Sequence, residues 1–288
     1  MEKRGFVFHT AEGDVERDFD YVRESADSGD IDSQYALGMA LLFGWDTDPD
    51  EDLGYVYLRK AADNGQTEAM TLLIRLYMQG EYDGMSNEDA VSMASKAAES
   101  GIPDAMLYYG LAFMDGISVK QDYGQAAIWF RKAANRGNSQ ARVSLAYLFQ
   151  EGLGVPKDEA KAFSMYRSAY NAGNVDGAYH LGICYEFGIG TKINLDKSIE
   201  AYRFCSSKGD YVAEERLGLI TADYNPKESF EHFVTAASNG MPVSMLMVGK
   251  CYLNGIGTEK NTEEAKKWLS LSSDNGIEEA KELLNSLS

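Results

Sequence analysis

Residues 141–173, ARVSLAYLFQEGLGVPKDEAKAFSMYRSAYNAG, decide the fold of this chain. Ala141, Leu145 and Phe149 are spaced at i, i+4 and i+8, which places them on one face of a helix. Gly152 ends this pattern, because glycine suits the left-handed conformation that closes a helix. Asp158 then begins a second helix, where a carboxylate stabilises the free N–H groups. The stretch therefore predicts two helices joined by a loop that contains glycine.

This unit recurs along the chain with a period of 36 residues. One glycine occurs at positions 29, 65, 101, 137, 173 and 209, and then at 240 and 276. A second series holds Gly38, Ile74, Gly110, Ala146, Gly182, Gly218 and Gly249 at equivalent positions. Both series shorten by five residues at the same place, between Gly218 and Gly240. Two series that shorten together indicate a genuine internal repeat.

Each repeat contains two helical patterns, which we call helix A and helix B. The clearest helix A is Ala-x-x-x-Leu-Gly-x-x-Tyr-x-x-Gly, and the clearest helix B is Ala-x-x-Trp/Tyr-x-x-Lys-Ala-Ala-x-x-Gly, as in residues 126–137. Large residues alternate with alanines, as interdigitating helices require. The small residue beside the leucine lets a second helix approach closely. The A–B loop contains Gly-x-Gly at residues 152–154, 188–190 and 255–257.

The repeats account for most of the chain. We predict an N-terminal extension over residues 1–15, followed by a single repeat domain over 16–288. Seven full repeats occupy about 30–276, and capping helices occupy 16–29 and 277–287. A single repeat cannot bury its own apolar face, so neighbouring repeats must cover it.

These motifs resemble the Sel-one-like repeat family, which is similar to tetratricopeptide repeats but has a longer A–B loop. The resemblance covers about nine-tenths of the chain; the sixth repeat departs from it, because its loop is reduced to Thr221–Pro226. It implies an all-α, right-handed α/α superhelical solenoid that acts as a protein-binding scaffold or adaptor. It also implies that helix A lines a concave groove.

The groove residues follow from that analogy as the positions of helix A outside its core face. They are Tyr35, Met39, Phe43, Leu107, Leu111, Met114, Val143, Tyr147, Tyr179, Ile183 and Phe187. Tyrosine and methionine are common at binding surfaces, so a groove for a protein or peptide with apolar anchors is one interpretation. The alternative is that superhelical curvature packs several of these side chains against the next repeat.

The charge of the chain is strongly negative and uneven. The net charge is -18; residues 1–100 hold 22 Asp and Glu against 8 Lys and Arg, and residues 101–288 hold 23 against 19. Such a surface repels nucleic acid and anionic membranes and favours a basic partner. The acidic residues proposed to dock such a partner are Asp32, Asp46, Asp48, Asp50 and Asp104. The alternative is a solvated face that keeps the protein in solution.

Motifs for chemistry are incomplete. Asp46-x-Asp48-x-Asp50 resembles the start of a calcium loop, but Glu51 and Tyr57 stand where glycine and glutamate are needed. Gly188-Ile-Gly-Thr-Lys lacks the order of a phosphate loop. The three histidines, His9, His180 and His232, have no partner at i+4, and the three cysteines, Cys184, Cys205 and Cys251, form no Cys-x-x-Cys pair. We expect no catalytic residue, no cofactor and no metal.

The sequence favours a non-enzymatic scaffold that holds one partner. The alternative is a bacterial immunity or antitoxin protein that neutralises a basic toxin, since similar repeats occur in proteins encoded beside secreted toxins. Hydrolysis by an unrecognised site is a third hypothesis. The start of the chain has no apolar run of signal-peptide length, so we expect a cytoplasmic protein. The oligomeric state is open, with a monomer favoured.

Overall fold

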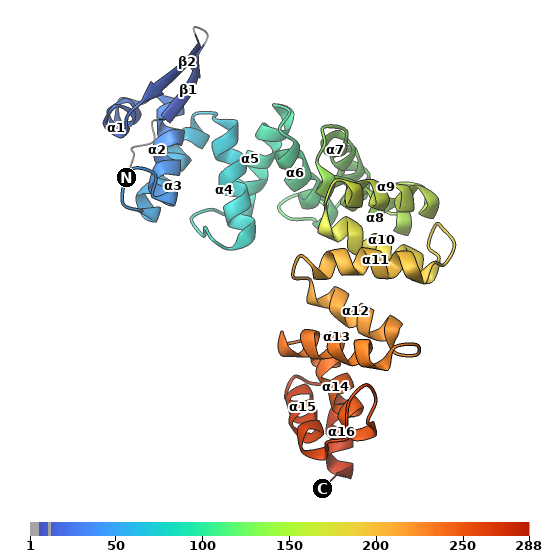
Figure 1. Ribbon diagram of the computed structural model, residues 1–288. Helices are drawn as coiled ribbons and strands as arrows, with labels where there is room; N and C mark the ends of the chain where they lie inside the picture. Colours follow the sequence, from blue (N-terminus) through green and yellow to red (C-terminus); the bar gives the residue numbers. More distant parts are fainter. Residues whose placement is uncertain (1–5, 11–12, 288) are drawn as a thin grey trace. The chain divides into compact units, whose positions relative to one another are not determined.

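The computed structural model describes residues 6–10 and 13–287 (Figure 1). The chain divides into two compact units, Met1–Ala141 with Leu153–Pro156, and Arg142–Gly152 with Lys157–Ser288. The division falls within helix α8, Ser139–Glu151. In each unit, helices that follow one another in the chain pack together.

The first unit begins with a two-stranded antiparallel hairpin, β1 (Phe6–Thr10) and β2 (Gly13–Arg17). Its helices are α1 (Phe19–Asp27), α2 (Ile31–Phe43), α3 (Glu51–Asp63), α4 (Thr67–Gln79), α5 (Asn87–Glu99), α6 (Pro103–Asp115) and α7 (Tyr123–Asn135). The hairpin lies mostly in the predicted N-terminal extension, where the helical patterns gave no sign of strands. Residues 1–5 and 11–12 of that extension lie outside the described residues.

The second unit contains the remaining helices. They are α9 (Glu159–Asn171), α10 (Val175–Phe187), α11 (Leu195–Ser206), α12 (Tyr211–Thr221), α13 (Pro226–Ser238), α14 (Pro242–Asn254), α15 (Thr262–Asp274) and α16 (Glu278–Ser286). From α2 onward the even-numbered helices are the predicted A helices and the odd-numbered ones the B helices. The predicted all-α architecture of helix pairs is confirmed, and the hairpin is an addition to it.

Helix A and helix B of one repeat pack through a small residue on A and a large residue on B. A Cβ added at Gly110 would lie 2.6 Å from the Phe130 ring, and one added at Gly182 would lie 2.6 Å from the Tyr202 ring. The rings of Phe130 and Tyr202 are fully buried. Any larger residue at these glycines would push the two helices apart, as the sequence pattern predicted.

The A–B loop is closed by one hydrogen bond, and this bond survives the deletion in the sixth repeat. In the fifth repeat the N–H of Asn194 donates to the carbonyl of Tyr185 at 2.8 Å, nine residues earlier. In the sixth, the N–H of Asn225 donates to the carbonyl of Thr221 at 2.8 Å, four residues earlier. The difference of five residues equals the deletion. The shortened loop therefore leads into helix B from the same point on helix A.

The second glycine of each Gly-x-Gly loop touches the helix B of the preceding repeat. A Cβ at Gly190 would lie 2.0 Å from the carbonyl oxygen of Glu159, the first residue of α9. A Cβ at Gly257 would lie 2.1 Å from the carbonyl oxygen of Pro226, the first residue of α13. These loops therefore join successive repeats by backbone contact, which only glycine permits.

Candidate partner-binding surfaces

The eleven predicted groove residues differ in how much of each side chain is accessible. Phe43, Tyr147 and Phe187 are 48%, 40% and 54% exposed. Tyr35, Met39, Leu111, Met114, Tyr179 and Ile183 are half-buried. Leu107 and Val143 are buried, with 7% and 4% of their surface exposed, so they contribute to packing and present no surface to a partner. Nine of the eleven side chains therefore remain accessible on helix A.

One position of helix A is apolar in five of the seven repeats and holds Arg75 and Lys250 in the other two, and we call the five apolar residues the A-face row. Its members are Met39 on α2, Leu111 on α6, Tyr147 on α8, Ile183 on α10 and Leu219 on α12. The sequence analysis missed Leu219, which is 43% exposed. It lies 36 residues after Ile183, so the repeat period alone predicts it. Tyr147 and Leu219 are exposed, whereas Met39, Leu111 and Ile183 are half-buried and Ile183 packs against a core cluster. Exposed apolar side chains at equivalent positions are typical of a binding surface.

In the second unit, polar contacts fix the side chains around Phe187. The Arg216 guanidinium of α12 lies 3.5 Å from the Glu186 carboxylate of α10 and 5.6 Å from the centroid of the Phe187 ring. The Tyr202 hydroxyl donates to the same carboxylate at 2.7 Å. Burial, together with this bond, raises the pKa of Tyr202, which keeps the hydroxyl protonated as a donor. Phe187 is thus an exposed aromatic side chain on a rigid support.

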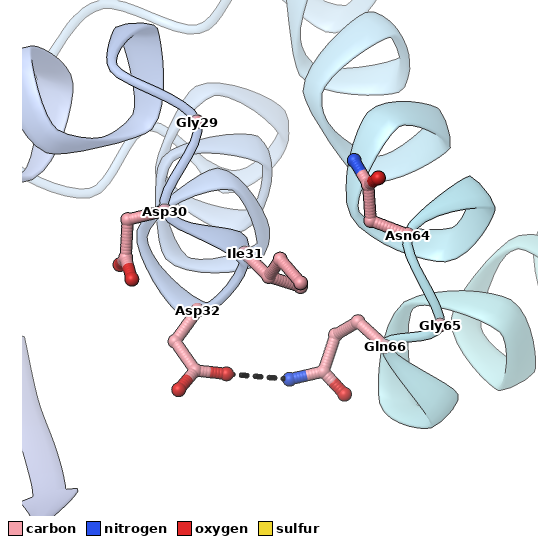
Figure 2. Close-up of a pocket in the computed structure, with 7 residues that line it drawn as sticks. All are labelled: Gly29, Asp30, Ile31, Asp32, Asn64, Gly65 and Gln66. Carbon is pink, nitrogen blue, oxygen red and sulfur yellow. Dashed lines mark hydrogen bonds between the residues drawn. The ribbon is translucent and has the colours of Figure 1, made fainter.

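Several of the predicted docking carboxylates make contacts within the fold. The Gln66 amide donates to Asp32 at 3.0 Å (Figure 2), and the Asn138 amide donates to Asp104 at 2.7 Å. Each bond joins the start of one helix A to the residue that precedes the next. Asp50 caps α3 by accepting the backbone N–H of Leu53 at 3.0 Å. Asp46 and Asp48 are exposed in the loop that follows α2.

The Asp32–Gln66 bond borders an open hollow of about 530 Å³ between the α1–α2 and α3–α4 turns (Figure 2). Its lining residues are Gly29, Asp30, Ile31, Asp32, Asn64, Gly65 and Gln66. They include no nucleophile and no histidine. The hollow is a gap between two neighbouring turns, and its polar groups cap helices and hold the repeats in register.

All three cysteines are buried, with free thiols. Burial raises the pKa of Cys184 and of Cys205 to about 12, and also raises that of Cys251. The thiolate, which is the nucleophilic form, is therefore scarce at neutral pH. These side chains act as small apolar residues of the core.

Two histidines lie in packed surroundings, and the side chain of His9 lies outside the described residues. His180 stacks on Tyr166 with ring centroids 4.8 Å apart, and burial lowers its pKa. His232 Nδ1 lies 2.6 Å from the Glu214 carboxylate. Among the described residues, no three His, Cys, Asp or Glu side chains are placed to share a metal ion. Within the same residues, every helix is too short or too polar to span a membrane.

The family model of the Sel1 repeat matches residues 31–66, 103–138, 139–174, 175–203, 211–241 and 242–277. These segments together cover more than half of the chain. The chain belongs to the Sel1 repeat family. Residues 67–102 are not matched, although α4 and α5 form a helix pair there. In this helix pair the sizes of the two packing residues are reversed. Ile74 stands where other A helices have a small residue, and Ala94 stands where other B helices have a large one; both are buried.

Solved structures of other Sel1 repeat proteins resemble this chain. The protective antigen c5321 of uropathogenic Escherichia coli, which displays an SLR fold, is 28% identical with a TM-score of 0.76. The alignment covers 93% of this chain and 59% of that one, so this chain spans about three-fifths of the antigen's length. A Sel1 repeat protein of Oxalobacter formigenes is 24% identical with a TM-score of 0.54, over 93% and 90% of the two chains.

The immunity protein Pa5087 of Pseudomonas aeruginosa is 16% identical with a TM-score of 0.47, over 73% of this chain and 82% of that one. So distant a likeness carries no weight in the functional argument. A comparison with curated proteins found no match.

Proposed function

We propose that this Sel1 repeat protein is a non-enzymatic scaffold that binds a partner protein or peptide on the accessible face of its A helices. Proteins built from Sel1 repeats are generally protein-interaction scaffolds. The observation that carries the proposal for this chain is the A-face row, in which five repeats place an apolar side chain at one accessible position. A purely solvated helix face would place polar residues there.

The A-face row is suited to binding in energetic terms. Burying one exposed leucine or phenylalanine contributes roughly 1.5–3 kcal/mol, and a few such anchors dominate the affinity of an interface. Phe187 lies outside the A-face row, four residues after Ile183 on the same helix, and is a second suitable anchor because its ring is 54% exposed while Arg216 and Glu186 support it. The negative surface adds a preference for a basic partner and disfavours nucleic acid. Buried free thiols suit a reducing compartment, so a cytoplasmic location is part of the proposal.

Two leucines provide a matched test of the A-face row. Leu219 on α12 and Leu271 on α15 are 43% and 46% exposed, and each lies in the last turn of its helix. Leu219 is on a helix A and Leu271 on a helix B. Changing either to Asp should cost similar helix stability, because each puts a negative charge near a helix C-terminus. Only the first change alters the proposed binding face.

The experiment is capture of partners from native lysate on immobilised protein, with identification by mass spectrometry. Circular dichroism first shows that the variants fold. We expect Leu219→Asp to lose a partner that the wild type and Leu271→Asp retain. Adding Phe187→Asp to Leu219→Asp should lower capture further. A loss of 1.5–3 kcal/mol per anchor would weaken binding by roughly 10- to 100-fold for each one. Equal retention by all four proteins would refute binding through the A helices.

The second candidate function, neutralisation of a basic toxin, is favoured by the charge of the first hundred residues. They hold 22 Asp and Glu against 8 Lys and Arg. Such a field speeds the encounter with a basic protein. A small basic enzyme as the captured partner, inhibited by the wild-type protein, would support this function. A toxin-like reading frame beside the gene would support it independently, and a neutral or acidic partner would count against it.

A further inference from the structure

The first repeat contains a pocket of about 310 Å³ that is lined by both apolar and charged side chains. Its lining residues are Phe19, Arg23, Leu37, Leu41, Thr47, Asp48, Pro49, Asp50, Leu53 and Tyr57. Leu37, Leu41 and Tyr57 belong to the core cluster of this repeat, and Phe19 packs against that cluster. The volume is near the lower end of the range of ligand pockets, roughly 300–1,000 Å³. Leu37, Leu41 and Tyr57 are nearly buried, with 1%, 6% and 7% of their surface exposed, and Leu53 at the same pocket is 38% exposed.

The loop that borders the pocket lacks the second glycine of the Gly-x-Gly loops, as do the loops of the second and third repeats, which hold Tyr82 and Ser118 at that position. In the fourth, fifth and seventh repeats the second glycine of Gly-x-Gly lies against the first residue of the preceding helix B, and a Cβ there would come within 2.0 to 2.3 Å of backbone atoms. In the first repeat that position is Asp46, with φ of 56°, and the preceding helix is α1. A residue with a Cβ cannot make the same approach. The loop therefore cannot contact the preceding helix as the Gly-x-Gly loops contact theirs.

The same loop presents negative charge and exposed aromatic rings. Residues 46–52, DTDPDED, contain five carboxylates. The rings of Phe43 and Trp45 stack with centroids 5.5 Å apart, and the two side chains are 48% and 47% exposed. Among the described residues that line the pocket, Arg23 alone is cationic. The pocket and this loop together are complementary to an apolar side chain flanked by positive charges.

We propose that this pocket binds one apolar side chain of a basic segment of a partner protein. The apolar side chain enters between Leu37, Leu41 and Leu53, where it is removed from water. A neighbouring lysine or arginine pairs with the exposed carboxylate of Asp48, and a second one lies over the exposed Trp45 ring as a cation–π contact. The occupant is thus a short peptide segment of the form basic–apolar–basic.

The proposal rests on the scaffold function, since it names the chemistry of a partner segment. It concerns α1, α2, α3 and the loop after α2, none of which carries Leu219 or Phe187. Loss of binding through those two residues and loss of binding at this pocket are therefore separate results.

The probe is a fluorescein-labelled peptide, Lys-Arg-Leu-Arg-Lys, titrated with the full chain by fluorescence anisotropy. Lys-Arg-Gly-Arg-Lys and Glu-Glu-Leu-Glu-Glu are the control peptides. We expect the leucine peptide to bind roughly 10- to 100-fold more tightly than the glycine peptide, the effect of burying one leucine. The acidic peptide should not bind. Equal binding of the leucine and glycine peptides, or no binding of either, would overturn the proposal.

A pair of charge-reversal variants locates the binding site. Asp48→Lys changes a carboxylate that lines the pocket, and Asp83→Lys makes the same change in the corresponding loop of the second repeat, where the residue is also exposed. We expect Asp48→Lys to weaken binding of the leucine peptide at least tenfold more than Asp83→Lys does. Equal weakening would assign binding to general electrostatic attraction and overturn the pocket. Light scattering then tests for self-association. A dimer that the peptide dissociates would mean that the pocket binds a second copy of the chain, which would also overturn the proposal.

Discussion

Gly190→Ala tests the backbone contact between successive repeats. Gly190 has φ of +66°, and an added Cβ would lie 2.0 Å from the carbonyl oxygen and 2.4 Å from the carbonyl carbon of Glu159. The left-handed conformation costs an L-residue roughly 1–2 kcal/mol. The steric overlap forces the loop away from α9, at the cost of an overpacked site, roughly 1–3 kcal/mol. We therefore expect a total loss of about 2–5 kcal/mol in the free energy of unfolding.

Gly173→Ala isolates the steric part of that loss. Gly173 also has a positive φ, +81°, but no atom lies within 4 Å of its added Cβ. Both variants share the conformational cost and the entropy that alanine removes from the unfolded chain. The difference between them should be about 1–3 kcal/mol, measured as the shift in the urea midpoint by circular dichroism at constant slope. If Gly190→Ala is no more destabilising than Gly173→Ala, the loop at Gly190 does not pack tightly against α9, and the close backbone contact is refuted.

Two further predictions concern titratable groups in the core. Burial raises the pKa values of Cys184, Cys205 and Cys251. A thiol reagent at pH 8 should therefore modify none of them rapidly in the folded protein and all three in denaturant. Rapid modification of the folded protein would show that the thiols are accessible. Burial lowers the pKa of His180 below its ordinary value of 6.5, so between the two values the unfolded chain binds a proton that the folded chain does not. The free energy of unfolding should therefore fall as pH drops below 6.5. His180→Phe, which keeps an aromatic ring beside Tyr166, should reduce this pH dependence, measured by urea unfolding at pH 7.5 and 5.5. An unchanged pH dependence would contradict the prediction.

Helix positions could be predicted from the sequence because their signals are local. The series Gly177, Leu181 and Tyr185 placed a helix that ends at Gly188, and α10 ends at Phe187 with Gly188 in the left-handed conformation. Capping residues such as Asp158 act within three positions of their partners, so a single sequence reveals them. The 36-residue period then carried each local assignment to the other repeats.

The hairpin and the pocket could not be predicted in this way, because each depends on contacts outside the repeat pattern. The strands β1 and β2 occur once, so no second copy supports them. Phe6 packs against the core cluster of the first repeat, 6.5 Å from Phe19 between ring centroids, and no periodic spacing announces such a contact. Asp46 replaces the glycine of the Gly-x-Gly loops, and only the folded repeats show which contact that glycine makes.

The acidic residues show why a charge pattern alone does not define a docking site. Asp48 and Asp50 are two positions apart and both line the pocket, yet Asp50 also accepts the Leu53 N–H as the cap of α3. Removing a capping carboxylate costs about 1 kcal/mol of helix stability, so Asp50→Ala would weaken binding whether or not a partner touches Asp50. Asp48 is not the cap, and its substitution changes the charge while leaving α3 capped. The structure therefore shows, as the sequence does not, which of the two neighbouring carboxylates has no capping role. Only the substitution of that residue, Asp48, tests whether the loop binds a basic segment.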